Sequence, residues 1–454
     1  MREGLQKVVS SDDTIVAIST PAGRSGIGLV RLSGSNAESI GNQFIRRPLS
    51  HQRAVTGRWQ APDGEVIDDV VVVLFRAPHS YTGEDLLEIS AHGNPLVLNL
   101  IVSMAQSAGA RLANPGEFTL RAVAHGKMDL IQAEAVRDFI DAQTDMQART
   151  AFRQIAGAVS KKIAPVKEEI MNLVAHLEAG IDFAEDDIDI PDGGAMADRV
   201  GQVRSTLEAL QETYSYGKLL TAGVRIVLAG KPNVGKSSLF NRLVAADRAI
   251  VTDVPGTTRD VVSESGSLDG IPLQFFDTAG IRETTDQIER IGVSRTLEAL
   301  SEADLALLVF DGTSALAIED DRVHETVRGL PHVVVANKCD LGRSADLETL
   351  HPVWVSARTG EGLDALRDAI RKALGDTRSE GSAESVLTSA RQNEAVLRGI
   401  AALASGEAAL RSGTPDEMVL LDLYAALSAL NELTGETTTE DILGRIFSKF
   451  CIGK

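Results

Sequence analysis

Short apolar runs and helix-like spacing alternate along the first 126 residues of the chain. Four runs are rich in β-branched and aliphatic residues and predict strands: 14–19, 26–33, 54–59 and 66–75. Between the last two runs stands Pro62-Asp63-Gly64, a typical turn sequence, so these strands are expected to form a hairpin. Apolar residues in 96–108 recur at three- and four-residue intervals, as in a helix. The pattern predicts an N-terminal α+β domain.

A helical texture replaces this pattern from Met128 onwards. Residues 128–180 are rich in alanine, and their apolar positions lie three and four residues apart. Residues 200–210 show the same spacing, and the helical texture returns in the segment that ends at Phe450. These stretches predict a helical bundle that is discontinuous in the sequence.

Between the helical stretches, residues 224–374 alternate short apolar runs with helical segments, which is typical of an α/β domain. The predicted strands are 224–229, 272–276, 304–310, 332–336 and 352–355. The simplest architecture is an α/β domain inserted between two halves of a helical domain, with a Gly-, Ser- and Glu-rich link at 376–385. The predicted domain boundaries are 1–126, 127–217, 218–378 and 379–454.

Composition narrows the class of protein. The 454 residues include 45 Lys and Arg and 64 Asp and Glu, giving a net charge of −19. That balance argues against a generally basic protein that coats nucleic acid, although a local basic patch remains open. The stretch 146–167 has no acidic residue and contains five basic ones: Arg149, Arg153, Lys161, Lys162 and Lys167.

Three further features predict a soluble, cytoplasmic protein. Two cysteines, Cys339 and Cys451, cannot form a disulfide framework and fit a reducing cytosol. The N-terminus has no apolar signal core. The longest aliphatic run, 70–75, is far too short to cross a membrane.

A phosphate-binding motif opens the α/β segment. Residues 230–237, Gly-Lys-Pro-Asn-Val-Gly-Lys-Ser, match G-x-x-x-x-G-K-[ST] and stand between a predicted strand and a predicted helix. Backbone amides of such a loop, together with the helix N-terminus, favour bound phosphate. Lys236 would neutralise the β- and γ-phosphates, and the Ser237 hydroxyl would ligate Mg²⁺.

Four more motifs follow in the order that a GTPase requires. A threonine in Gly256–Asp260 can close over Mg²⁺, while Asp277–Gly280 can reach the Mg²⁺ shell and sense the γ-phosphate. The Asp of Asn337–Asp340 can accept two hydrogen bonds from guanine that adenine does not offer, and Ser356–Arg358 can support the base. The five motifs predict a Ras-like P-loop GTPase domain that binds GTP and GDP.

Two catalytic roles stay open on the residues alone. Ile281 follows the Asp-Thr-Ala-Gly motif, where Ras has the glutamine that orients the attacking water. The acidic candidates for this role are Glu283, Asp286 and Glu289. The positive charge of an arginine finger could come from a partner's arginine, from Arg282, or from a monovalent cation bound to the Asn233 amide.

The motifs and the segments around them resemble the MnmE family, also called TrmE, of tRNA uridine-modification GTPases. The similarity runs essentially from end to end. The segments outside the GTPase motifs that carry it are Thr14–Ala17, Gly28–Gly34, Tyr81–Asp85, Asn114–Phe118, Lys127–Leu130, Gln132–Ala135, Leu443–Phe447 and Phe450–Lys454.

The resemblance implies an N-terminal domain that forms a homodimer and binds 5-formyltetrahydrofolate or a related one-carbon folate. The residues that match the folate site are Arg31, Glu88, Lys127 and Lys454. Cations and a carboxylate suit a glutamate tail and a pterin ring. Without the resemblance, Arg31 would be interpreted as a strand residue that faces solvent.

The resemblance also implies that GTPase domains dimerise around K⁺, which takes the place of an arginine finger. The implied K⁺ ligands are Asn233, Thr252, Val254 and Thr257. The implied Mg²⁺ ligands are Ser237 and Thr258, and Glu289 matches the water-orienting glutamate. Motifs and resemblance together predict these GTP contacts: Asn233, Val234, Gly235, Lys236, Ser237, Ser238, Thr252, Asp253, Val254, Pro255, Gly256, Thr257, Thr258, Asp277, Thr278, Ala279, Gly280, Asn337, Lys338, Asp340, Ser356, Ala357 and Arg358.

Family members act with the FAD protein MnmG (GidA), and the pair adds a (carboxymethyl)aminomethyl-type group to C5 of the wobble uridine of certain tRNAs. The basic stretch 146–167 is then either a tRNA footprint or a solvated helix face. Cys451 is either a small buried apolar residue or a thiol near the folate that takes part in one-carbon or uridine chemistry.

Two other functions compete with this one. The first alternative is a GTPase switch in ribosome assembly or stress regulation, and such proteins usually carry a separate RNA-binding module. The second is a folate-dependent transferase, which would leave the intact nucleotide motifs unexplained.

Overall fold

The computed structural model describes residues 13–182, 192–245, 263–277, 303–375, 385–437 and 440–453. Its contacts divide the chain into two compact units. The first unit comprises Met1–Arg137, Gln154–Leu207 and Glu394–Lys454, and the second comprises Asp138–Arg153 and Glu208–Asn393. Each unit therefore combines segments that lie far apart in the sequence.

The N-terminal part of the first unit is a six-stranded sheet of order β3-β4-β5-β2-β1-β6. All neighbours pair antiparallel except β1 and β6, which are parallel. The strands are β1 Thr14–Ile18, β2 Ser25–Ser33, β3 Ala54–Gln60, β4 Val66–Phe75, β5 Leu86–Gly93 and β6 Ala110–Leu112. The predicted hairpin is confirmed, because β3 and β4 pair across the turn in which Gly64 N–H donates to the Ala61 carbonyl.

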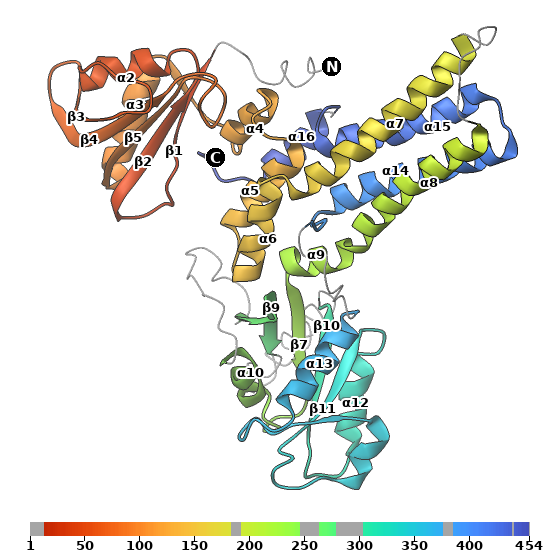
Figure 1. Ribbon diagram of the computed structural model, residues 1–454. Helices are drawn as coiled ribbons and strands as arrows, with labels where there is room; N and C mark the ends of the chain where they lie inside the picture. The colour runs from red at the N-terminus through yellow and green to blue at the C-terminus, as the bar shows by residue number, and fades with distance from the viewer. Residues whose placement is uncertain are drawn as a thin grey trace. The chain divides into compact units, whose positions relative to one another are not determined.

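Alternating side chains give this sheet two apolar faces. Val16 belongs to the core formed with helices α2 (Ala37–Ile45) and α3 (Pro95–Ser107), which lie beside the sheet in Figure 1. Its neighbours Ile15 and Ala17 instead pack with Phe118 of α4 (Glu117–Ala124). The sheet is therefore covered on both faces, and the second face is the one that adjoins the helical part of the unit.

Long helices form the rest of the first unit. They are α5 (Leu130–Ile140), α7 (Ala158–Asp182), α8 (Gly193–Glu212), α14 (Ala390–Ser412), α15 (Asp416–Thr434) and α16 (Glu440–Phe447). The last residues of α5 and α8 and the first residues of α14 belong to the second unit. Helix α7 packs along α15, although some 230 residues separate them (Figure 1). This pairing confirms that the helical stretches on the two sides of the α/β segment form one bundle.

The C-terminal tail returns to the N-terminal sheet. Phe447 and Phe450 share a buried cluster with residues of α4 and α5. Beyond them, Gly116 N–H donates to the Cys451 carbonyl at 3.4 Å, and Ser19 Oγ donates to the Gly453 carbonyl at 2.9 Å. Two of the segments that carry the family resemblance, around Gly116 and at the C-terminus, are therefore in direct contact.

Gly116 is required for this contact. Its φ of +70° is a left-handed conformation, and a Cβ there would lie 2.9 Å from the Phe447 carbonyl oxygen. Gly116→Ala should lower the free energy of unfolding by about 2–4 kcal/mol, since it adds both backbone strain and overpacking. Gly109→Ala is the matched control, because Gly109 has φ of +104° but open space around it. Denaturant unfolding of both variants measures the difference, and equal losses would show that the tail contact adds nothing.

The second unit contains a six-stranded sheet of order β12-β11-β10-β7-β9-β8. Its strands are β7 Val224–Ala229, β8 Ser263–Leu268, β9 Ile271–Asp277, β10 Leu305–Asp311, β11 His332–Asn337 and β12 Val353–Trp354. The five strands predicted from the sequence are confirmed and are all parallel. The sequence did not reveal β8, whose residues Ser-Glu-Ser-Gly-Ser-Leu are mostly polar and pair antiparallel with β9.

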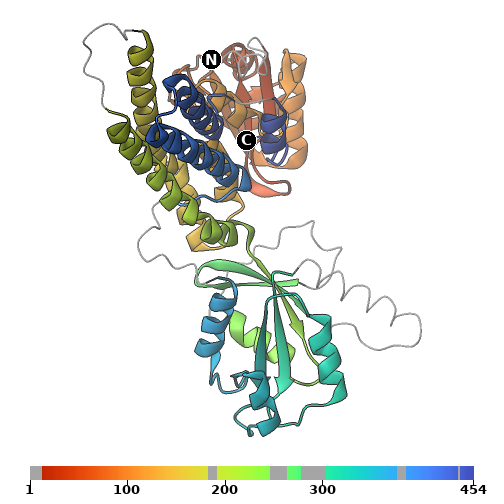
Figure 2. The ribbon, with the colours of Figure 1, turned by 90° about the vertical axis from the view of Figure 1, so that its right-hand side faces the viewer.

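Helices cover both faces of this sheet, as Figure 2 shows. One core includes residues of α10 (Lys236–Ala245) and α13 (Leu363–Ala373). The opposite core includes Val327, which follows α12 (Ile318–Thr326), and Leu347 of a 3₁₀ helix at Ala345–Leu350. This doubly covered parallel sheet is the α/β architecture that the alternating pattern predicts.

Helix α6 (Asp145–Ile155) of the second unit was expected to belong to the bundle, and α9 (Tyr214–Ala222) crosses the predicted boundary between residues 217 and 218. Helix α6 follows Thr144, whose Oγ1 donates to the Gly270 carbonyl at 2.6 Å. Gln147 Nε2 donates to the Leu220 carbonyl of α9 at 2.9 Å. Most of α6 and all of α9 therefore belong to the second unit, while the domain boundaries given above stay predictions.

Candidate nucleotide site

The nucleotide motifs meet at one edge of the second unit's sheet. The phosphate loop follows β7, while Asp311 and Asn337 are the last residues of β10 and β11. The Ser356–Arg358 motif follows β12. Because these strands are parallel, their carboxyl ends share an edge, where ligands of open α/β sheets bind. Strand β10 lies between β7 and β11, so Asp311 stands between the phosphate loop and the base-recognition motif.

Close packing leaves no room for a side chain at either glycine of the phosphate loop. A Cβ on Gly230 would lie 2.2 Å from the Val309 carbonyl oxygen, and one on Gly235 would lie 2.3 Å from Asn337 Nδ2. Both residues have positive φ, of +157° and +95°. The loop then leads directly into α10, whose first-turn amides and dipole form an anion-binding end.

Lys236 is buried at the start of α10. Its Nζ donates to the carbonyls of Gly230 and Lys231 at 2.7 and 2.8 Å, which closes the loop upon itself. The lysine charge is therefore held beside the main chain of the phosphate loop. This is the arrangement that a chain of phosphates requires.

Asn337 joins two of the motifs. The residue is 2% exposed, and its Nδ2 donates to the Val234 carbonyl at 2.9 Å. Its Oδ1 accepts from the Ala357 N–H at 3.0 Å. One buried amide thus fixes the phosphate loop relative to the loop that supports the base.

Asp340 presents an ionised carboxylate at the same edge. Oδ1 accepts from Ser356 Oγ at 2.5 Å, and Oδ2 accepts from Arg358 Nη2 at 2.6 Å. The Ser356 hydrogen bond, followed by that of Arg358, holds the pKa of the Asp340 carboxyl below its usual value. An ionised acceptor is what the ring N–H and the amino group of guanine require. Guanine would share Oδ2 with Arg358 or displace it.

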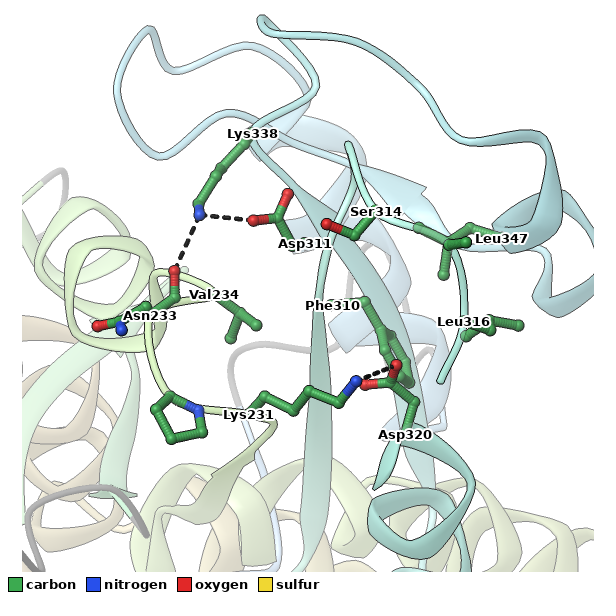
Figure 3. A pocket seen from close by; sticks show the side chains of 12 residues that line it. Lys231, Asn233, Val234, Phe310, Asp311, Ser314, Leu316, Asp320, Lys338 and Leu347 are labelled. Carbon is green, nitrogen blue, oxygen red and sulfur yellow. Dashed lines mark hydrogen bonds and ion pairs between the residues drawn. The ribbon is translucent and has the colours of Figure 1, made fainter. Parts of the chain in front are cut away.

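Two lysine–carboxylate pairs flank the phosphate loop. Lys338 Nζ lies 2.6 Å from Asp311 Oδ2, and Lys231 Nζ lies 2.6 Å from Asp320 Oδ2. Lys338 Nζ also donates to the Asn233 carbonyl at 2.9 Å. Figure 3 shows both pairs at the border of a cavity of about 240 Å³. Burial would raise the pKa of Asp311, but hydrogen bonds from Lys338 and Thr313 hold it below its usual value.

The described folate-site residues lie on the N-terminal sheet or beside its Pro78–Gly83 loop. Arg31 and Glu88 face each other across β2 and β5, with Arg31 Nη2 2.6 Å from Glu88 Oε1. The Arg31 guanidinium also lies 5.5 Å from the Tyr81 ring centre. Only 17% of the Arg31 side chain is exposed, so it is not the solvent-facing residue that its strand pattern alone suggests. Lys127 Nζ donates to the Pro78 carbonyl, at the start of the loop that carries Tyr81.

A buried charge cluster, which no sequence motif predicts, lies next to this loop and includes Glu84, the residue that follows it. Arg121, with 1% of its side chain exposed, pairs with Asp13, Glu84 and Glu117 at 2.6 to 3.1 Å. Glu84 also accepts from Ser33 Oγ at 2.7 Å. Glu84 and Glu117 stand in the Tyr81–Asp85 and Asn114–Phe118 segments, but their spacing of 33 residues gives no hint of a shared arginine.

Comparison with known proteins decides the family. A family model described as "MnmE helical domain" matches residues 130–451, and one described as "GTP-binding protein TrmE N-terminus" matches residues 14–127. A Koribacter versatilis protein named tRNA modification GTPase MnmE is 47% identical and covers 98% of this chain and 99% of its own length. Proteins of that name from Symbiobacterium thermophilum and Aquifex aeolicus are 45% and 43% identical, and this chain covers 100% of each.

The chain belongs to the MnmE family of GTPases. Among solved structures, a tyrosine-to-alanine variant of Aquifex aeolicus Era bound to GDP and AlF₄⁻ is 28% identical, and the match covers 41% of this chain and 66% of the Era chain. Its TM-score of 0.28 is too low to bear on function. The MnmE assignment thus rests on the family models and the full-length relatives.

The structure brings the described nucleotide motifs of this MnmE protein together. Asn233–Ser238, Asn337–Asp340 and Ser356–Arg358 are joined by the hydrogen bonds given above, and Asp277 is the last residue of β9. Other predicted contacts lie outside the described residues. They are Thr252, Asp253, Val254, Pro255, Gly256, Thr257, Thr258, Thr278, Ala279, Gly280, Glu289 and Lys454.

Two interpretations of single residues change. Lys167 is buried, and its Nζ lies 2.5 Å from Glu436 Oε1, so it is wrong to count it in an exposed basic footprint. Arg149, Arg153, Lys161 and Lys162 are exposed. Cys451 is also exposed, which contradicts its interpretation as a buried apolar residue. Among the helices in the described parts of the chain, none is long and apolar enough to cross a membrane.

Proposed function

We propose that this MnmE GTPase uses GTP hydrolysis to drive modification of tRNA, at C5 of the wobble uridine of certain tRNAs. The group added would be of the (carboxymethyl)aminomethyl type, and an FAD-binding protein of the MnmG (GidA) type would be the partner. One observation carries the proposal. The phosphate loop and the two guanine motifs converge at one sheet edge, in a chain that matches both MnmE family models.

The nucleotide part of the cycle follows from the residue types. Lys236 and the α10 N-terminus would hold the phosphates, and Asp340 would select guanine. Ser237 and Thr258 would hold Mg²⁺, which supplies charge neutralisation at the phosphate oxygens. Ser237 fits this role because it is the second residue of α10, directly after Lys236.

K⁺ would take the place of an arginine finger when two GTPase domains meet. Asn233 offers an amide oxygen on an exposed side chain, which suits a hard cation, and Thr252, Val254 and Thr257 would complete the set. Glu289 would orient the attacking water. Domain movement in the cycle would reach the N-terminal domain and the partner through the helical bundle.

The N-terminal domain would form the homodimer and bind 5-formyltetrahydrofolate or a related one-carbon folate. Arg31, Glu88, Lys127 and Lys454 would contact it. The contacts of Arg31 with Glu88 and Tyr81 support this, because a shielded arginine–carboxylate pair offers donors and an acceptor beside an aromatic ring.

Arg31→Ala should weaken binding of 5-formyltetrahydrofolate by at least tenfold, since it removes a charge-assisted contact from a partly buried site. Equilibrium dialysis of the purified protein measures this. Arg58→Ala is the control, because Arg58 lies on the same sheet but its side chain is 66% exposed. Equal affinity of wild type and Arg31→Ala would remove Arg31 from the site.

tRNA contact is proposed for the exposed residues Arg149 and Arg153 of α6. Reversal of both charges should lower tRNA affinity and flatten its dependence on salt. If affinity and salt slope stay at wild-type values, these residues form only a solvated helix face.

Reconstitution tests the whole proposal. The purified protein, an MnmG-type partner, tRNA, GTP and a one-carbon folate should yield modified wobble uridine, and a non-hydrolysable GTP analogue should not. Cys451→Ser belongs in the same assay: loss of modification with normal GTP turnover would place the thiol in the chemistry. Unmodified tRNA in the complete reaction would favour the alternative of a GTPase switch in ribosome assembly or stress regulation.

A further inference from the structure

Asp311 is held in a fixed orientation at the end of β10. Its Oδ1 accepts from the Thr313 N–H at 3.0 Å and from Thr313 Oγ1 at 2.6 Å. Its Oδ2 is directed at Lys338 Nζ, 2.6 Å away. The two carboxylate oxygens therefore have separate tasks, one within the β10 turn and one towards Lys338.

Lys338 transmits this constraint to the phosphate loop. The same Nζ donates to the Asn233 carbonyl at 2.9 Å, so one ammonium group bridges Asp311 and Asn233, as Figure 3 shows. Asn233 has φ of +65°, a left-handed conformation that asparagine tolerates better than most residues other than glycine. A hydrogen bond to its carbonyl fixes the peptide plane and, with it, the direction of the side chain.

The Asn233 side-chain amide and the Asn233 main-chain carbonyl point in different directions (Figure 3). In Figure 3 the amide points away from Lys338 and Asp311, while the carbonyl points towards them. A monovalent cation binds weakly, so the placement of each oxygen ligand should govern its affinity. Small rotations about the Asn233 backbone would move the amide oxygen out of place.

We propose that Asp311 is a positioning residue for the monovalent-cation site: through Lys338 it holds Asn233 in the conformation in which the Asn233 amide binds K⁺. This inference rests on the proposed role of Asn233 as a K⁺ ligand. It also links two functions, because Lys338 belongs to the guanine-recognition motif. Guanine binding and cation binding then act on the same lysine.

Lys231 and Asp320 provide an internal control. They form a pair of the same chemistry and the same 2.6 Å length on the other side of the phosphate loop (Figure 3). Asp320 Oδ2 also accepts from the Ala317 N–H, so this carboxylate anchors the start of α12. Neither contact reaches the Asn233 carbonyl. Asp320→Asn should therefore alter stability without altering the response to K⁺.

The experiment compares full-length wild type, Asp311→Asn, Asp311→Glu and Asp320→Asn. KCl is titrated against choline chloride at constant ionic strength, and GTP turnover gives the half-activating K⁺ concentration. A second readout is the K⁺-dependent rise in the thermal unfolding midpoint with a non-hydrolysable GTP analogue bound, which reports cation binding without turnover. Thr313→Val serves as a milder variant, since it removes the Thr313 Oγ1 hydrogen bond to Asp311 Oδ1 but keeps the backbone hydrogen bond and the carboxylate charge.

Asp311→Asn should raise the half-activating K⁺ concentration about three- to tenfold and shift the unfolding response in parallel. Thr313→Val should give a smaller shift, Asp311→Glu a partial rescue, and Asp320→Asn none. A K⁺-activated wild type with an unchanged Asp311→Asn curve, or with equal shifts in Asp311→Asn and Asp320→Asn, would overturn the positioning role alone. A wild type that does not respond to K⁺ would overturn both this role and the proposed cation site.

Discussion

Asp340→Asn should lower the affinity for GTP by about 10²–10⁴-fold and raise the affinity for xanthosine triphosphate. The carboxylate is an acceptor of two hydrogen bonds, and its partners Ser356 and Arg358 keep it ionised. An asparagine amide would present a donor to the guanine amino group, whereas xanthine offers a carbonyl at that position. Titration with fluorescent analogues of both nucleotides measures the exchange.

Asp364→Asn is the control for this change of specificity. Asp364 lies at the start of α13 in the same unit, and its side chain is almost completely exposed. It should bind GTP as wild type does. If Asp340→Asn retained wild-type GTP affinity, guanine would have to be recognised elsewhere than at this sheet edge.

Glu289→Ala should lower the turnover number for GTP by about 10²–10⁴-fold and leave GTP affinity nearly unchanged. Glu289 lies outside the described residues, and its role is proposed from the family motif. A residue that only orients the attacking water acts in the chemical step, so its loss should appear in kcat and not in binding. Single-turnover hydrolysis and nucleotide titration separate the two quantities.

Glu283→Ala and Asp286→Ala are matched controls from the same stretch of chain, and both should hydrolyse GTP at nearly the wild-type rate. Equal losses in all three variants would point to a general effect of acidic residues in this stretch. Normal turnover by Glu289→Ala would show that Glu289 does not orient the attacking water.

Local sequence patterns were sufficient to predict much of the fold. The strands of the second unit were predictable because parallel strands buried on both faces are continuous apolar runs, as in Leu305–Asp311. Strand β8 was not predicted, because its sequence is mostly polar and lacks the apolar run of a buried strand. It lies at the edge of the sheet, where its pairing with β9 outweighs its low strand propensity.

The same limit applies to individual charges. A run of basic residues marks Lys167, but only the fold shows that α7 places it beside Glu436. Arg121 gives no signal at all, since its partners come from three separate segments. Asp311 likewise belongs to no sequence motif. Only the order of the strands shows that it lies between two nucleotide motifs.

Contacts between distant segments explain why certain motifs occur together. Gly116 and the C-terminal tail share a tight contact, and Asn337 joins Val234 to Ala357. A sequence motif contains the residues on one side of such a contact but does not identify the segment on the other side. The structure supplies the partner, and with it the physical reason for the glycine or the amide.

GTP turnover by the purified wild-type protein in KCl and in NaCl, at equal ionic strength, tests the central claim most directly. Turnover is expected to be at least tenfold faster in KCl, because K⁺ at Asn233 would supply the charge that an arginine finger supplies in other GTPases. Equal rates in the two salts would contradict it and would require an arginine, from this chain or from a partner, in place of the cation.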